Sequence, residues 1–462
     1  MGFIIILLCA QFFLNNGIYL FLGSLCFCFL GFYLQKPYRP AVFTILFVYH
    51  FVQISAGVWL SNYLGKDVNF RSPNQGVAIL ASYVGLIAMM LPIIYYNNKI
   101  PSFSFVELRN HAQRLSTRKT FIAYLTAFFA MNALGAMAFL FAGLTQLIFS
   151  LVKIKWLLLL LFGYQVIIKK EMQKHFIICC GMEFVFGLFS YFSDFKTIIL
   201  FIMCLLLTFV TAVRGRHLII IFFFGYLMVL LGLMWTSIKG EYREFLNQGS
   251  RTQTKQVSQE EAINKLIDLA QQGTENEQGD PAVALLDRLQ YTFHLAKTMD
   301  NVPSNIKHQQ GANWGESLEF ALTPRVLNPD KPKFEATVKT RKYTGLAYAG
   351  QKQGASFSLG YFADGYIDFG LVGMMIPLIL LGVLYGSIYY FFLRKSSQNI
   401  LFNFAVVSAI FMEFIPLEMD STFLIGRLFA TVVMFYLLKL FLFPWLIDYL
   451  SAQRRGRRHF EM

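Results

Sequence analysis

Charged and polar residues beside long apolar segments are the first candidates for chemistry, because a charge in or near hydrocarbon costs several kcal/mol unless it has a partner or a function. Arginine pairs with phosphate oxygens through two parallel hydrogen bonds, and a carboxylate can take the proton of an attacking hydroxyl. Four groups of this kind occur: Arg214 with Arg216; Asp364, Tyr366 and Asp368; Glu413, Glu418 and Asp420; and Arg427.

Each group also has a structural explanation. Arg214 fits a basic anchor on the cytoplasmic side of a membrane, and Asp364 and Asp368 fit the N-terminal cap of a helix. The acids around Pro416 fit a short solvated turn, and Arg427 fits an ion pair between helices. Charge placement alone does not decide between these explanations and a functional site.

A further cluster of cations lies between residues 325 and 342. It contains six basic residues and only two acidic ones: Arg325, Lys331, Lys333, Lys339, Arg341 and Lys342, against Asp330 and Glu335. One interpretation is an anion site at a membrane surface, where guanidinium groups pair with phosphate. The other is a solvated loop that faces anionic headgroups.

The elements that position these residues are predicted from hydrophobicity. Of 462 residues, 56% are hydrophobic and 14% are charged, against about 25% charged in an ordinary soluble domain. A membrane-spanning helix needs about 20 mainly apolar residues. We therefore predict an all-α polytopic membrane protein with about twelve spans, near residues 2–14, 17–34, 41–62, 76–96, 120–143, 145–168, 175–193, 195–212, 217–235, 366–393, 400–417 and 424–449. The first is short, so eleven or thirteen spans remain open.

The distribution of charge predicts the orientation. The net charge is +14, but the long polar loop of residues 236–363 carries 15 basic and 14 acidic residues. Eighteen basic residues fall in one set of joints between spans and at the C-terminal end, and five fall in the short joints of the other set. The positive-inside rule then places both termini in the cytoplasm and the loop outside it. Because the excess charge follows topology, and no soluble segment shows a basic face with interleaved aromatics, a nucleic-acid partner is not expected.

The chain is predicted to comprise one membrane domain with one insertion. The N-terminal spans occupy residues 1–235, the loop 236–363, and the C-terminal spans and basic tail 364–462. In the loop, Ser258 and Glu261 predict a capped helix over 259–271, and Asp280-Pro281 predicts the start of a second helix that continues through Ala296. The six cysteines and seven histidines lack metal-ligand spacing, so we expect no cofactor and no metal site.

Several loop motifs resemble the Wzy-type O-antigen and exopolysaccharide repeat-unit polymerases. The likeness covers residues 286–373, and two elements carry most of it: Pro324-Arg325 followed by Pro329-Asp330-Lys331-Pro332, and Asp364-Gly365-Tyr366-Ile367-Asp368-Phe369-Gly370. Trp314-Gly315-Glu316-Ser317 and Ser358-Leu359-Gly360 add to it. The segment from Thr211 to Arg216 is also similar to a Thr-x-Ser-Arg-Gly element of such polymerases, with Val213 in place of Ser.

The resemblance implies a metal-independent, inverting glycosyltransferase with a GT-C-like fold in a bacterial inner (plasma) membrane. Its partners would be the lipid bilayer and undecaprenyl-pyrophosphate-linked oligosaccharide, with a chain-length regulator and a flippase as further candidates. The residues implied as catalytic are Arg325, Asp364 and Glu316, and those implied as substrate-binding are Arg214, Lys331, Lys333, Arg341, Tyr366, Asp368 and Arg427. Arg214 conflicts with the topology, since the predicted orientation puts it at the cytoplasmic end.

Two other functions remain open. A flippase or exporter of lipid-linked oligosaccharide would share the charge pattern, although transporters commonly contain internal repeats, which this chain lacks. An O-antigen ligase would share the fold, but its family is expected to carry a His at the start of the span after the loop. Here that position reads Tyr361-Phe362-Ala363-Asp364.

Overall fold

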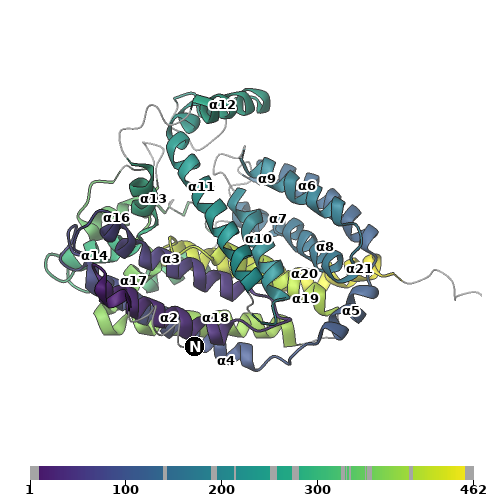
Figure 1. Cartoon of the computed structure of the whole chain (residues 1–462), viewed down its shortest axis with the longest axis horizontal. Helices are drawn as coiled ribbons and strands as arrows, with labels where there is room; N and C mark the ends of the chain where they lie inside the picture. The colour runs from purple at the N-terminus through teal and green to yellow at the C-terminus, as the bar shows by residue number, and fades with distance from the viewer. Residues whose placement is uncertain are drawn as a thin grey trace, which may run out of the picture.

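The structure is a computed structural model. It describes residues 10–138, 143–188, 195–212, 215–249, 257–272, 280–323, 328, 330–331, 334–348, 350, 356–394 and 399–452. Every regular element in these ranges is a helix. The all-α prediction is therefore confirmed for the described part of the chain, whose helices pack as a bundle (Figure 1).

The helices follow the hydrophobic segments closely. Before the loop they are the 3-10 helix η1 (Gln11–Phe13), then α2 (Gly17–Leu34), α3 (Val42–Tyr63), α4 (Gln75–Asn98), α5 (Phe105–Gln113), α6 (Thr117–Met137), α7 (Thr145–Val152), α8 (Ile154–Lys169), α9 (Gln173–Leu188), α10 (Phe195–Thr208) and α11 (Gly215–Leu246). The loop contains α12 (Gln259–Gln272), α13 (Pro281–Leu289), α14 (Thr292–Asn301), α15 (Ala312–Leu322) and α16 (Ala336–Thr344). The C-terminal part contains α17 (Tyr361–Gly373), α18 (Met375–Arg394), α19 (Ile400–Phe411), η4 (Met412–Phe414), α20 (Ser421–Phe441) and α21 (Phe443–Leu450).

Seven segments are long and apolar enough to cross a membrane: α2, α3, α4, α6, α7 together with α8, α18 and α20. Three apolar helices are shorter, namely Phe195–Thr208, Gly225–Trp235 and Ile400–Phe414. Most of the first predicted span, 2–14, lies outside the described residues. A helical membrane protein is thus supported, whereas a total of about twelve spans and a GT-C-like arrangement stay predictions.

Two predicted spans are interrupted. The span expected over 366–393 is kinked inside α17, where Gly370 leaves helical geometry with φ +71° and ψ −170°, and α18 begins after Met374. Only glycine adopts such a conformation at low cost. The span expected over 424–449 ends at Phe441 and continues as α21, which has Pro444 in its first turn. Hydrophobicity alone does not reveal these breaks, because the apolar character continues through them.

The two expected loop helices differ in outcome. Helix α12 forms as predicted, with the Ser258 hydroxyl accepting from the Glu261 N–H at 3.2 Å. Asp280 caps α13 by accepting from the Ala282 N–H at 2.8 Å, but the helix stops at Leu289 and α14 follows. The prediction of one continuous helix through Ala296 is wrong, since the chain turns where the Tyr291 N–H bonds to a carbonyl of α3.

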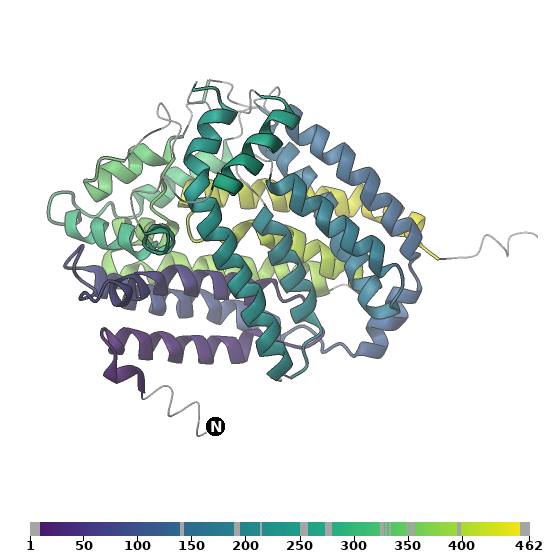
Figure 2. The same ribbon diagram turned by 45° about the horizontal axis from the view of Figure 1, so that its top comes forward.

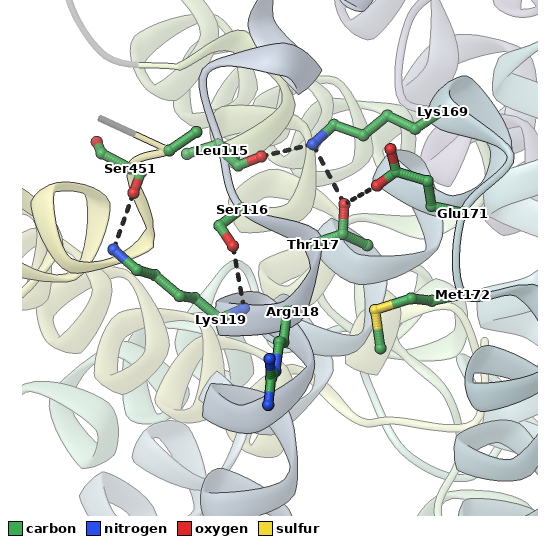
Figure 3. Close-up of a pocket in the computed structure, with 10 residues that line it drawn as sticks. Leu115, Ser116, Thr117, Arg118, Lys119, Lys169, Glu171, Met172 and Ser451 are labelled. Carbon is green, nitrogen blue, oxygen red and sulfur yellow. Dashed lines mark hydrogen bonds between the residues drawn. The ribbon is translucent and has the colours of Figure 1, made fainter. Parts of the chain in front are cut away.

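One end of the bundle joins the helix ends predicted to be cytoplasmic. The Arg39 guanidinium donates to the carbonyl of Ile100 at 2.5 Å, and the Asn399 side chain donates to the carbonyl of His111 at 2.7 Å. The start of α6 and the end of α21 meet at this end as well (Figure 3). The basic joints after α2, α4 and α8 therefore lie together.

The opposite end carries the loop. Asn16, just before α2, donates to Asn62 near the end of α3 at 2.8 Å, and Arg71 in the next joint pairs with Asp287 of α13. Figures 1 and 2 show α13, α14 and α16 gathered at this end, far from α5 and α21. These three loop helices thus share one end of the bundle, whereas α12 packs against α11.

Labelling in intact cells tests the predicted sidedness. Ser304, in the exposed loop, and Asn110, on the exposed face of α5, lie at opposite ends of the chain's fold. We expect Ser304→Cys to react with a membrane-impermeant maleimide in intact cells and Asn110→Cys to react only after permeabilisation, with the unsubstituted protein as background. The reverse pattern would invert the orientation and remove the loop from the outer face.

Candidate functional site

The loop and the C-terminal helices meet below the rim of the bundle. Gln53 of α3 accepts from the Leu417 N–H at 2.8 Å, donates to Glu418 at 3.2 Å, and accepts from the Tyr291 N–H through its carbonyl at 3.2 Å. Gln53 lies ten residues before the end of α3 at Tyr63, which corresponds to about 15 Å along a helix. The turn between η4 and α20 is therefore recessed, and the loop descends to meet it.

Helix α17 starts at this depth. Its N-cap, Gly360, has φ +80°, and a Cβ there would lie 3.0 Å from the Leu417 carbonyl oxygen and 3.1 Å from the Tyr291 ring. The Tyr361 hydroxyl at the first position bonds to His50 of α3. A backbone conformation suited to glycine and a close approach to the recessed turn thus fix where α17 begins.

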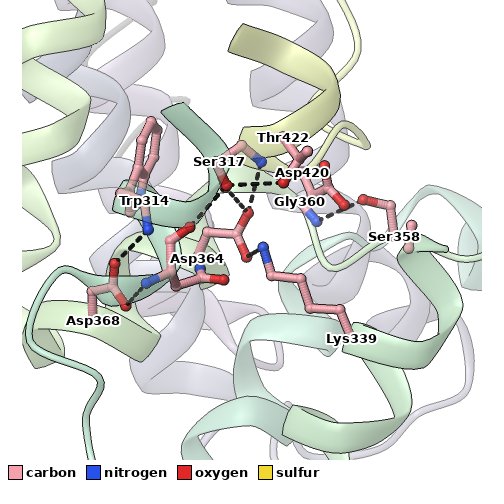
Figure 4. Close-up of polar contacts among 12 residues, drawn as sticks. Trp314, Ser317, Lys339, Ser358, Gly360, Asp364, Asp368, Asp420 and Thr422 are labelled. Atoms are coloured by element: carbon pink, nitrogen blue, oxygen red, sulfur yellow. Dashed lines mark hydrogen bonds and ion pairs between the residues drawn. The ribbon is translucent and has the colours of Figure 1, made fainter. Parts of the chain in front are cut away.

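Two acids of α17 connect it to neighbouring helices. Asp364 and Asp368 are four residues apart and so lie on one face of the helix. Asp364 accepts from both the N–H and the hydroxyl of Ser421 at 2.7 Å, and Asp368 accepts from the N–H groups of Asn313 at 3.1 Å and Trp314 at 2.8 Å (Figure 4). These acids were expected to cap the start of their own helix. They do accept from N–H groups at helix starts, but Asp364 does so at α20 and Asp368 at α15.

Lys339 of α16 completes an ion pair with Asp364. Its Nζ lies 2.8 Å from a carboxylate oxygen, and the two side chains are only 10% and 0% exposed. Burial lowers the pKa of Lys339, but attraction to Asp364 and Asp420 outweighs burial, so the pKa is raised and the ammonium keeps its proton. This contact ties α16, α17 and α20 together at one point.

Asp420 is the second carboxylate of the cluster. It is the N-cap of α20, where one oxygen accepts from the Phe423 N–H at 2.9 Å. The other oxygen is buried and has no hydrogen-bond partner among the described residues. Burial and repulsion by Asp364 raise the pKa of Asp420 to about 6, although Lys339 opposes this. Asp420 therefore changes charge around pH 6 rather than in the usual acidic range of a carboxyl group.

Two buried donors nearby also lack hydrogen-bond partners within the described ranges: the side-chain amide nitrogen of Asn313 and the indole nitrogen of Trp314. Both belong to the first turn of α15, whose Ser317 hydroxyl lies 2.8 Å from the hydroxyls of Ser421 and Thr422. Buried polar groups are normally satisfied by protein or water. Unsatisfied groups on both α15 and α20 are what a polar ligand at this junction would use.

The sequence-predicted residues separate into three sets. Asp364 and Asp368 belong to the cluster. Arg214, Arg325 and Lys333 lie outside the described residues. The remaining predicted residues are described but make other contacts or lie elsewhere: Glu316, Lys331, Arg341, Tyr366 and Arg427.

The contacts of this third set are mainly structural. Lys331 donates to the carbonyl of Thr323 at 2.7 Å and so covers the end of α15, and Arg341 donates to the carbonyl of Tyr348 at 2.7 Å. The Tyr366 hydroxyl donates to the carbonyl of Val302 at 2.9 Å. Glu316 is exposed on α15. None of these four side chains is shown in contact with the Lys339–Asp364 pair.

Arg427 belongs to a second charged cluster farther along α20. Its guanidinium lies 3.5 Å from Glu413, whose other oxygen pairs with Lys153, the residue between α7 and α8. Arg427 therefore forms an ion pair between two helices, which is the structural explanation that its position in the sequence allowed. Lys153 also donates to Thr431 at 2.7 Å, which fastens α7 and α8 to α20.

Sequence reasoning noted Lys339 and Asp420 but assigned neither to the site. Lys339 was one of six basic residues in a run, and Asp420 was one of three acids around Pro416. The sequence does not show which residues Lys339 and Asp420 interact with, because those partners lie 25 or more positions away in the chain. In the described ranges, no three His, Cys, Asp or Glu side chains lie close enough to hold a metal ion.

Residues 75–445 match a sequence family described as a domain of unknown function, DUF8712. The chain belongs to this family. The matched range contains the whole cluster, from Asn313 to Thr422, as well as both halves of the broken helix α17–α18. No curated protein and no solved structure matches the chain. For this DUF8712 protein, the arrangement of the site is thus the basis for a functional conclusion.

Substitution of Lys339 tests the importance of the buried pair for folding. Removing one partner of a buried ion pair leaves the other charge uncompensated and costs about 3–5 kcal/mol. We expect Lys339→Met to lower the thermal unfolding temperature in detergent by several degrees, and Lys342→Met, on the exposed face of the same helix, to leave it almost unchanged. Equal stability of the two variants would show that the pair does not hold α16 in place.

Proposed function

We propose that this protein is a membrane glycosyltransferase that joins lipid-linked oligosaccharides on the outer face of the membrane. In the reaction, a hydroxyl of the acceptor glycan attacks the anomeric carbon of a donor glycan, and the bond from that carbon to the lipid diphosphate breaks. The hydroxyl proton passes to a base, and the diphosphate leaves with the bonding electrons. Repetition extends the glycan into an O-antigen, capsule or exopolysaccharide.

The observation that carries the proposal is the unpartnered, buried oxygen of Asp420. A general base works best when its pKa is near the operating pH, and the pKa of Asp420 is raised to about 6. Its other oxygen is held by the Phe423 N–H, so the carboxylate has a fixed orientation. We therefore assign Asp420, rather than the exposed Glu316, as the base that accepts the hydroxyl proton.

Asp364 and Lys339 act as positioning residues in this proposal. The Lys339 ammonium forms an ion pair with Asp364 at 2.8 Å and is also attracted by the charge of Asp420. Asp364 also holds the Ser421 N–H and hydroxyl, next to Asp420 in the chain. In this proposal, the Lys339–Asp364 pair thus holds Asp420 in position through Ser421 and influences its charge.

The leaving diphosphate is assigned to the basic residues between Thr323 and Phe334. The Phe334 end of this segment lies beside the site, because the Phe334 ring packs on Phe423 of α20 at 5.2 Å, and Lys331 ties the segment to the C-terminal end of α15. Phe423 is three residues from Asp420. Cations placed there would stabilise the charge that develops on the leaving group, a role we propose for Arg325, with Lys331 and Lys333 as further phosphate contacts.

A transporter of the same lipid-linked glycans is the second candidate. It is favoured by charged pairs on apolar helices, Lys155 with Glu183 at 2.8 Å and Lys153 with Glu413, because charges of this kind often mark transport pathways. A transporter moves its substrate without changing bonds. Product analysis therefore separates the two functions.

The purified protein, given a lipid-diphosphate repeat unit, is expected to produce a ladder of glycan lengths. Asp420→Asn should stop elongation while preserving the fold, because Asn caps a helix as well as Asp does; the exposed Glu319→Gln should elongate normally. Since the carboxylate form is the base, the rate should rise with pH through about 6 and fall below it. A ladder from Asp420→Asn would exclude Asp420 as the base, and unchanged substrate with flipped lipid would favour transport.

Arg325→Ala tests the assignment of the diphosphate. Loss of one group that stabilises a leaving anion lowers the rate by about 100- to 1,000-fold. We expect that loss in the rate of elongation, with membrane insertion intact, whereas Lys342→Ala, which removes an exposed cation of the same basic run, should elongate at the normal rate. Normal elongation by Arg325→Ala would move the diphosphate site away from this segment.

A further inference from the structure

A pocket of about 360 Å³ lies at the end of the bundle opposite the candidate site (Figure 3). Its walls come from the start of α6, the end of α8 and the end of α21. The volume falls in the range of small-molecule sites, about 300–1,000 Å³. The proposed glycosyl transfer makes no use of it.

The pocket is lined by three cations and one carboxylate: Arg118, Lys119, Lys169 and Glu171. The Lys119 ammonium donates to the carbonyl of Ser451 at 2.9 Å, and the Lys169 ammonium donates to the carbonyl of Leu115 at 2.6 Å. Carbonyl oxygens orient an ammonium but do not cancel its charge. In the described part of the chain, none of the three cations lies within 4.0 Å of a carboxylate.

The first turn of α6 adds to the attraction for an anion. The Ser116 hydroxyl caps the helix by accepting from the Lys119 N–H at 3.4 Å, and the buried Thr117 hydroxyl donates to Glu171 at 3.1 Å. The positive end of the helix dipole therefore faces the same space as the basic side chains. The Lys169 ammonium also donates to Thr117, at 3.2 Å, so Glu171 offsets part of its charge, and the three cations remain in excess over this one carboxylate.

Aromatic residues beside the pocket indicate its depth. Trp445 and Tyr449 of α21 are 62% and 40% exposed and are stacked with ring centroids 5.9 Å apart. Such residues mark the level of lipid headgroups at the ends of membrane helices. The Lys119 ammonium lies 5.7 Å from the centre of the Tyr449 ring. The pocket is thus continuous with the part of the surface that contacts headgroups.

The geometry points to a binding site for the phosphate of an anionic membrane lipid in this pocket. The phosphate would pair with the exposed guanidinium of Arg118 and with the ammonium groups of Lys119 and Lys169, while the glycerol backbone and acyl chains continue past Trp445 into the bilayer. Because the site joins α6, α8 and α21, a bound lipid would hold these three helices together. Inorganic phosphate is also an anion but gains nothing from the aromatic surface.

The test uses the full chain in phosphatidylcholine nanodiscs, with or without a minor fraction of phosphatidylglycerol, and a parallel sample with millimolar inorganic phosphate. Thermal unfolding and native mass spectrometry report stabilisation and retained lipid. The pocket variant is Arg118→Ala with Lys119→Gln. The matched control is Arg109→Ala with Lys174→Gln, which removes the same charges from exposed positions at the same end of the bundle.

We expect phosphatidylglycerol to stabilise the unsubstituted protein and the control, and its affinity to fall about tenfold or more in the pocket variant, because charge-assisted contacts to phosphate are lost. Equal losses in both variants would mean diffuse surface attraction and would overturn the site. Stabilisation by inorganic phosphate alone would overturn the lipid as its source. No effect of phosphatidylglycerol would overturn the proposal, and none of these outcomes bears on glycosyl transfer.

Discussion

Most of the site depends on one carboxylate. Asp364 receives two hydrogen bonds from Ser421 at 2.7 Å and an ion pair from Lys339 at 2.8 Å, and its side chain is fully buried. A buried charge is stable only when it is paired and hydrogen-bonded. This requirement brings the first turn of α20 and the middle of α16 to the same point on α17, although the three segments are separate in the sequence.

The two acids of the cluster therefore differ in how their carboxylate oxygens are satisfied. Asp364 has its partners supplied by the protein, whereas one oxygen of Asp420 has none in the described part of the chain. Burial and repulsion by Asp364 raise the pKa of Asp420 to about 6, so this carboxylate can accept and release a proton in that pH range. Paired acids with different environments are a common means of obtaining one fixed charge and one proton acceptor.

The opposite end of the protein follows a different principle. There the Lys119 and Lys169 ammonium groups donate to the carbonyls of Ser451 and Leu115, and one carboxylate, Glu171, attracts Lys169. At the end that carries the loop, the Lys339 ammonium is paired with a buried carboxylate and organises the site from within. In our proposals, basic residues attract an anion at one end of the bundle and position a carboxylate at the other.

The sequence by itself predicted the all-α architecture and most helix positions, because hydrophobicity and capping residues act over short distances along the chain. It also singled out Asp364 and Asp368, which the structure places in one polar cluster. Only the tertiary structure showed that α17 is broken at Gly370 and begins far below the rim, and that Lys339 and Asp420 meet Asp364. These features depend on contacts between segments that lie from 25 to more than 300 residues apart in the sequence. A linear pattern records which groups are present, but the burial and pairing that decide their chemistry arise only when those segments pack.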